Sequence, residues 1–157
     1  KLILKSSTSF DEKNLNKFLI NKFKKENIGE DKIEILSRKK TYLEHLESYN
    51  KIDLSLDTFP YPGVTTSFES VSMGTPVLTM KGFNFNSRCG ESINKNLNIE
   101  NLIANNEDDY IDKALLIKKE NKIDQKYKQN LRSEALKSCL FDTETFAKDF
   151  GSLLKSL

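Results

Sequence analysis

Hydrophobic positions along the chain follow two spacings, one typical of buried strands and one typical of amphipathic helices. Short apolar runs predict four strands, at residues 2–6, 33–37, 52–56 and 76–81. Between the first two runs, apolar residues recur at helical spacing at Leu15, Phe18, Leu19 and Phe23. Strands and helices that alternate with short connections predict βαβ units around a parallel sheet, so the pattern indicates an α/β fold.

After Gly82 the pattern changes from alternating elements to mostly helix. A loop is expected over residues 82–92, followed by helices near residues 92–97, 107–120 and 123–138. A last helix begins after Asp142, and its apolar side chains share one face, which predicts packing in the core. These side chains are Phe146, Phe150, Leu153 and Leu154. Two helix starts carry the spacing of a capping box, Ser9 with Glu12 and Thr41 with Glu44.

The stretch from Leu56 to Val77 joins a strand, a turn, a helix start and the next strand. Thr65 and Thr66 fall where the helix begins, and Gly74 and Pro76 follow its end. Unpaired N–H groups and the positive end of the helix dipole make such a junction a site for phosphate. A simpler interpretation also stands, because Thr66 and Glu69 have the spacing of a capping box.

Length and composition indicate the number of domains and argue against several classes of partner. A chain of 157 residues predicts one domain that buries roughly 70% of its unfolded surface. The net charge of +2 favours neither a nucleic-acid nor a membrane partner, and no apolar run approaches the roughly 20 residues of a membrane span. Cys89 and Cys139 lie far apart, which argues against zinc and predicts ordinary buried thiols in a reducing, cytoplasmic compartment.

The run Leu56-Asp57-Thr58-Phe59-Pro60-Tyr61, followed by Gly63-Val64-Thr65-Thr66, resembles the donor-binding motif of the O-linked N-acetylglucosamine transferase family. Its continuation, Glu69-Ser70 with Gly74-Thr75-Pro76-Val77, is similar to a wider pattern of two-lobed (GT-B) glycosyltransferases. The resemblance covers nearly the whole chain. It implies a Rossmann-like parallel sheet flanked by helices, the C-terminal lobe of a GT-B enzyme. Residues 1–157 would then form a single nucleotide-sugar-binding lobe, and the start in a strand without Met fits a fragment of a longer protein.

The resemblance also implies which residues bind the donor. Thr65 and Thr66, with the backbone amide of Val64, would hold the diphosphate of a nucleotide-sugar. Glu69 would accept hydrogen bonds from the ribose hydroxyls. Asp57 ends its strand inside the motif, and we interpret it as a residue that orients the loop without touching the donor.

Three further residues complete the predicted donor site. His45 lies ahead of Asp53 in the same place as the family histidine that packs against the uracil ring. Tyr42, beside it, would stack on the base or donate its hydroxyl. Family members place Lys and Arg around this histidine, whereas this chain has Tyr42 and Ser48, which leaves the donor's identity open. Arg88 resembles a family arginine, and either contacts the sugar or fixes its loop by bonding backbone carbonyls.

The implied reaction is inverting transfer of N-acetylglucosamine from UDP-N-acetylglucosamine to Ser or Thr hydroxyls of a protein, without metal or other cofactor. No catalytic base is recognisable, so the catalytic residues stay unknown. The expected partners are the donor, a protein acceptor and an N-terminal lobe that supplies the acceptor side, and tetratricopeptide-like repeats further upstream would indicate a protein acceptor. The chain alone is expected to be inactive. Two alternatives are another GT-B transferase with a different donor or acceptor, and a degenerate, non-catalytic binding module.

Overall fold

The computed structural model describes residues 1–5 and 12–157, and the predicted capping by Ser9 lies outside them. The chain divides into two compact units, Lys1–Ser48 and Tyr49–Leu157, and each is described by itself. The assignment of all 157 residues to a single lobe stays a prediction.

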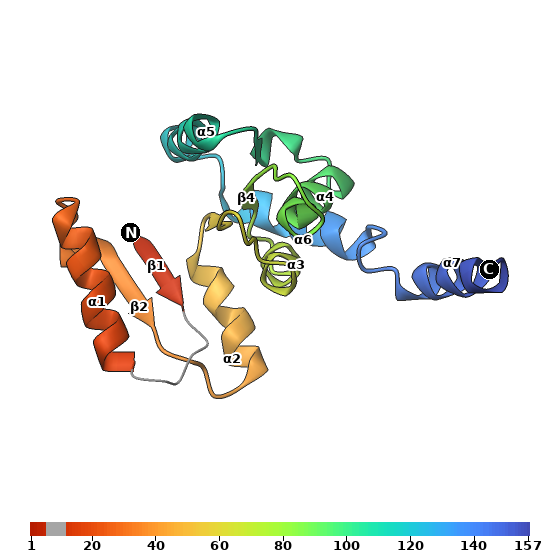
Figure 1. The fold of residues 1–157 in the computed structure, drawn as a ribbon, viewed down its shortest axis with the longest axis horizontal. Helices are drawn as coiled ribbons and strands as arrows, with labels where there is room; N and C mark the ends of the chain where they lie inside the picture. The colour runs from red at the N-terminus through yellow and green to blue at the C-terminus, as the bar shows by residue number, and fades with distance from the viewer. Residues whose placement is uncertain (6–11) are drawn as a thin grey trace. The chain divides into compact units, whose positions relative to one another are not determined.

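The first unit is a pair of parallel strands with helices between and after them. Its elements are β1 (Leu2–Lys5), α1 (Glu12–Lys25), the short 3-10 helix η1 (Glu30–Lys32), β2 (Ile33–Leu36) and α2 (Tyr42–Glu47). β1 and β2 lie side by side (Figure 1), in a register that pairs Leu2 with Ile33 and Lys5 with Leu36. Thr41 caps α2 by accepting a hydrogen bond from the Glu44 N–H at 3.2 Å, so the predicted cap is confirmed.

The second unit contains a three-stranded parallel sheet in the order β3-β4-β5. Its elements in chain order are η2 (Ser48–Lys51), β3 (Ser55–Leu56), α3 (Thr65–Ser72), β4 (Val77–Met80), η3 (Asn86–Arg88), α4 (Cys89–Asn96), η4 (Glu100–Leu102), β5 (Ile103–Ala104), α5 (Glu107–Glu120), α6 (Gln125–Lys137) and α7 (Thr143–Lys155). Because the three strands are parallel, their carboxyl ends lie at the same edge of the sheet. Parallel strands flanked by helices confirm the predicted α/β class.

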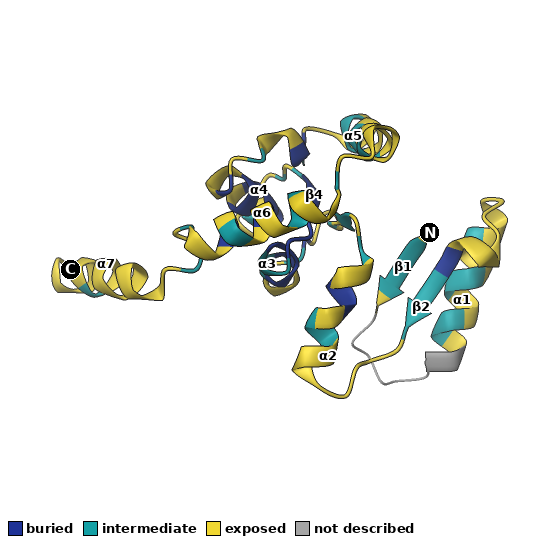
Figure 2. Ribbon diagram, turned by 180° about the vertical axis from the view of Figure 1, so that it is seen from behind, coloured by how far each residue is buried: buried dark blue, intermediate teal, exposed yellow. Residues whose placement is uncertain are grey.

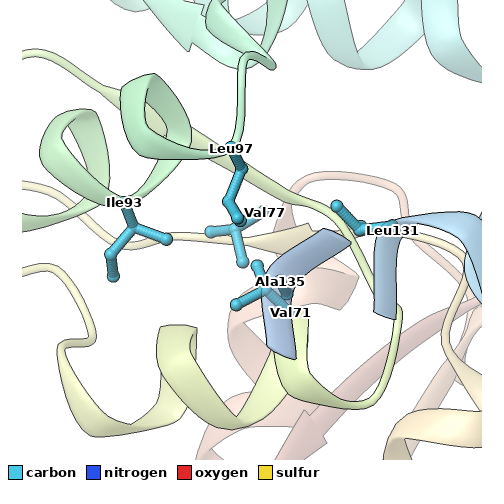
Figure 3. Packing of buried hydrophobic residues seen from close by; sticks show 6 residues of the cluster. All are labelled: Val71, Val77, Ile93, Leu97, Leu131 and Ala135. Carbon is cyan, nitrogen blue, oxygen red and sulfur yellow. The ribbon is translucent and has the colours of Figure 1, made fainter. Parts of the chain in front are cut away.

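The core of the second unit lies between β4 and the helices α3, α4 and α6. Its apolar side chains point toward one another (Figure 3), and they are Val71, Val77, Ile93, Leu97, Leu131 and Ala135. Gly74 follows α3 with φ at +80°, and a Cβ there would lie 2.2 Å from the backbone oxygen of Lys128. Glycine is therefore required at this close approach, as the predicted end of the helix implies.

Two predictions of burial are wrong. Figure 2 shows α7 almost wholly exposed, with Phe146 68% and Phe150 50% exposed. The two rings stack on each other at 5.8 Å, so their helical spacing produces a local pair on the helix surface. Cys139 is also exposed, and Cys89 is half-buried. None of the helices in residues 1–5 and 12–157 combines the length and apolar character of a membrane span.

Candidate functional site

The loop between β3 and α3 is held in place by Asp57. Its carboxylate accepts hydrogen bonds from the Gly63 N–H at 2.7 Å and from the Thr79 hydroxyl at 2.9 Å. The Tyr110 hydroxyl on α5 donates to the Asp57 carbonyl oxygen at 2.9 Å. Burial raises the pKa of Asp57, while the bonds from Gly63 and Thr79 act in the opposite direction. The prediction that Asp57 orients this loop is confirmed.

The loop delivers the chain into α3 with an N-terminus that no side chain caps. Val64 is the N-cap residue, and the structure gives it no side-chain hydrogen bond to the first turn. Thr65 and Thr66 are the first two residues of the helix, and both side chains are exposed. The hydroxyl of Ser67 donates to the Gly63 carbonyl oxygen at 2.6 Å and ties the first turn to the loop. The positive end of the helix dipole and two threonine hydroxyls therefore meet at one place.

The alternative interpretation of Thr66 and Glu69 as a capping box is wrong. A capping box would make Thr66 the N-cap and Ser67 the first helical residue, but the helix begins two residues earlier, at Thr65, with Val64 as its N-cap. Glu69 is buried, and the Tyr49 hydroxyl lies 3.3 Å from its Oε2 and 3.2 Å from the Thr66 carbonyl oxygen. Tyr49 thus positions a carboxylate one turn from the threonines, a neighbour that the sequence pattern does not indicate.

Arg88 pairs with a buried carboxylate and not with the backbone carbonyls that one interpretation predicted. Its Nε lies 2.8 Å from Glu91 Oε2 and its Nη2 3.2 Å from Oε1. Lys95 lies 2.8 Å from the same carboxylate and Lys81 3.9 Å from it. The hydrogen bond from Arg88 is the main cause that holds the pKa of Glu91 at about 2, against an ordinary value of 4.5. Glu91 was missed, although its position three residues after Arg88 on a helix is a readable signal.

Val64 and Arg88 line one pocket, with a volume of about 720 Å³, beside the N-terminus of α3. Its wall is mostly apolar and includes Phe68, Phe83, Phe85 and Ile93. Phe83 and Phe85 are 80% and 85% exposed on the loop after β4. The structure thus brings the helix end, an aromatic loop and Arg88 to the same edge of the second unit's sheet.

His45 and Tyr42 belong to the first unit, on α2. Their ring centroids lie 6.1 Å apart at a tilt of 44°, and the Nδ1 of His45 contacts the Nζ of Lys5 at the end of β1. The prediction that these two residues join Thr65, Thr66 and Glu69 in one donor site stays a prediction. In residues 1–5 and 12–157, no group of three His, Cys, Asp or Glu side chains is arranged to hold a metal ion.

A parallel α/β fold with an uncapped helix start at the carboxyl edge of its sheet is typical of proteins that bind phosphate-bearing ligands. The model of glycosyl transferase family 41 matches residues 9–150. The chain therefore belongs to glycosyl transferase family 41.

Named relatives agree with this family. A probable UDP-N-acetylglucosamine–peptide N-acetylglucosaminyltransferase SPINDLY of Solanum lycopersicum is 37% identical over 114 residues, and that of Petunia hybrida is 35% identical. Each match covers 73% of this chain and 12% of the relative, so the chain spans about an eighth of these proteins. A solved mutant of the Thermobaculum terrenum O-GlcNAc transferase superposes with a TM-score of 0.74 at 29% identity, covering 86% of this chain and 25% of that one.

Proposed function

We propose that this chain is the donor-binding part of a transferase that moves N-acetylglucosamine from UDP-N-acetylglucosamine to hydroxyls of a protein acceptor. The relatives of this chain are named as such transferases, and the chain belongs to glycosyl transferase family 41. The observation that carries the proposal is the uncapped N-terminus of α3, where exposed Thr65 and Thr66 meet a loop fixed by Asp57.

The chain's own contribution to the reaction is electrostatic. When the bond between the sugar and the diphosphate breaks, negative charge grows on the leaving diphosphate. A diphosphate at Thr65 and Thr66 would meet the positive end of the α3 dipole and the N–H groups of its first turn. These dipoles are fixed before the reaction, so they stabilise the new charge without reorganisation. We therefore propose that donor binding needs no divalent metal.

We propose that Glu69 makes a second contact with the donor. It lies one turn along α3 from the threonines, and Tyr49 holds one of its carboxylate oxygens. A carboxylate accepts hydrogen bonds only, which suits the two hydroxyls of a ribose. With the ribose at Glu69, the diphosphate would lie at the start of α3, and the base would lie on the other side of the ribose.

Calorimetry with UDP tests the proposal. The chain is expected to bind UDP equally well with magnesium and with EDTA, and Thr65→Ala with Thr66→Ala should weaken binding. Thr143→Ala is the matched control, because Thr143 is the first residue of α7 as Thr65 is of α3. Because no side chain caps α3, the double variant should also keep its free energy of unfolding, in contrast to the loss of about 1 kcal/mol for a removed cap.

Each other outcome contradicts a definite part of the proposal. UDP binding that requires magnesium would refute the role of the helix dipole. Binding of a different nucleotide but not UDP, in a panel of nucleoside diphosphates, would support another GT-B donor. Absence of any binding at millimolar concentrations would support the degenerate binding module.

A further inference from the structure

Lys5 and His45 meet inside the first unit although they lie on different elements. Lys5 ends β1, which pairs with β2 so that Lys5 is opposite Leu36, the last residue of β2. The chain then leads from β2 into α2, whose last turn carries His45. The Nζ of Lys5 contacts the Nδ1 of the imidazole. The contact is therefore set by the strand pairing and by the short connection to the helix.

The chemistry of this pair fixes where the imidazole proton lies. A lysine ammonium has three N–H donors and no acceptor, so Nδ1 must accept the hydrogen bond and carry no proton. The proton of the neutral ring then sits on Nε2. The ring presents an N–H donor on the side away from Lys5.

The backbone around His45 is fixed as well. Its N–H donates to the Thr41 carbonyl oxygen at 3.1 Å, and its carbonyl oxygen accepts from the Ser48 hydroxyl at 2.5 Å. The ring is half-buried and lies beside the ring of Tyr42. With the main chain and Nδ1 both held, the plane of the imidazole is restricted.

We propose that Lys5 is a positioning residue that holds His45 as its Nε2–H tautomer and orients the ring plane for a nucleotide base. This role rests on the proposed binding of a UDP donor and on the sequence-based prediction that His45 packs against its base. A flat ring whose tautomer and plane are fixed stacks on a base in one orientation. Lys5 itself is not assigned a contact with the nucleotide.

Nuclear magnetic resonance tests the tautomer without any ligand. His45 is the only histidine in the chain, so a long-range proton–nitrogen spectrum of the imidazole reports on this ring alone. The native chain should show an unprotonated Nδ1 and a protonated Nε2 at neutral pH. Lys5→Met should give averaged signals from a tautomer mixture, and Lys5→Arg, which restores a cationic donor, should return the native pattern.

Lys1→Met is the matched control, because it removes the same charge from the same strand. Lys1 pairs with Glu34 at 3.3 Å and should leave the imidazole spectrum unchanged. If Lys5→Met lowers the folded fraction of the chain, the Lys5→Leu variant is used in its place. A proton on Nδ1 in the native chain, or an identical spectrum after Lys5 is replaced, would overturn the proposal.

Titration with UDP supplies the second readout. Lys5→Met should weaken UDP binding by roughly two- to tenfold, the range expected for one hydrogen bond, and Lys5→Arg should recover most of it. If the spectra behave as expected but the native chain binds no nucleotide, the pairing stands and the proposed function fails. If the native chain binds UDP and Lys5→Met binds it equally well, the positioning role is refuted while the proposed function survives.

Discussion

At the scale of single residues, the fold strongly controls the charge of Glu91. Its side chain is 4% exposed, yet Arg88, Lys95 and Lys81 all approach it from the solvent side. A buried carboxylate is stable only when such partners replace the water it has lost. The cluster therefore anchors the loop after β4, which carries Phe83 and Phe85, to the start of α4.

Replacing Glu91 should change how stability depends on pH. The pKa of Glu91 is lowered in the folded chain to about 2 from an ordinary value of 4.5, so the carboxylate stabilises the fold above pH 4.5. That contribution is lost as the pH falls from about 4.5 toward 2. Glu91→Gln should cost about 1–3 kcal/mol of unfolding free energy at neutral pH, since the cations are half exposed.

Urea unfolding at a series of pH values measures this effect. The difference between the native chain and Glu91→Gln should shrink between pH 4.5 and 2. Glu134→Gln on α6 is the control, because Glu134 is exposed and its replacement should change stability by less than about 0.5 kcal/mol. A difference that stays constant across this window would show that the ionised carboxylate does not stabilise the fold.

The roles of some residues in the site can be predicted from the sequence, and those of others cannot. Asp57 and the helix start at Thr65 follow from local patterns, because a strand end, a turn and a helix start are each encoded by neighbouring residues. Tyr49 does not, because it reaches Glu69 across 20 positions of sequence. The assumed cap at Thr66 failed because the spacing of a capping box recurs in sequences where the helix starts earlier.

At the scale of elements, α7 shows the limit of amphipathic patterns. Its apolar stripe predicts a buried face, and the period is indeed helical. The pattern states that one face is apolar, but not that this chain supplies a partner for it. The sequence pattern did not predict β5. This strand has only two residues, Ile103 and Ala104, and is too short to show a period.

Variants of α7 should therefore leave stability almost unchanged. Phe146→Ser and Phe150→Ser should each alter the free energy of unfolding by no more than about 0.5 kcal/mol, because both rings are exposed. Leu131→Ala on α6 is the comparison, and it should cost about 2–5 kcal/mol because Leu131 is 6% exposed in the core cluster. Thermal and urea unfolding of the three variants decide the matter. A loss at Phe146 or Phe150 as large as that at Leu131 would show that α7 is buried in solution.

At the scale of the whole molecule, the chain accounts for a small part of the proteins it resembles. It covers 12% of the SPINDLY relatives and 25% of the solved O-GlcNAc transferase. The proposed site holds a donor at the carboxyl edge of a parallel sheet, where loops lead into helix N-termini. We assign no residue of this chain to the attack by an acceptor hydroxyl. We therefore propose that donor binding by this chain can be separated from transfer of the sugar.

The 157-residue chain should bind donor but transfer no sugar by itself, even at high enzyme and donor concentrations. A longer polypeptide that adds the rest of a catalytic region of the kind its relatives possess should transfer N-acetylglucosamine, because it brings the acceptor side of the site. In that polypeptide, Glu69→Ala should raise KM for the donor with little change in kcat, since a ribose contact is equally strong in the ground and transition states. Assays with labelled UDP-N-acetylglucosamine and protein acceptors measure both chains, with Glu134→Ala as the matched control. Turnover by the 157-residue chain alone would reveal a catalytic base among its own residues, and a loss of kcat in Glu69→Ala would move Glu69 from donor binding to the chemical step.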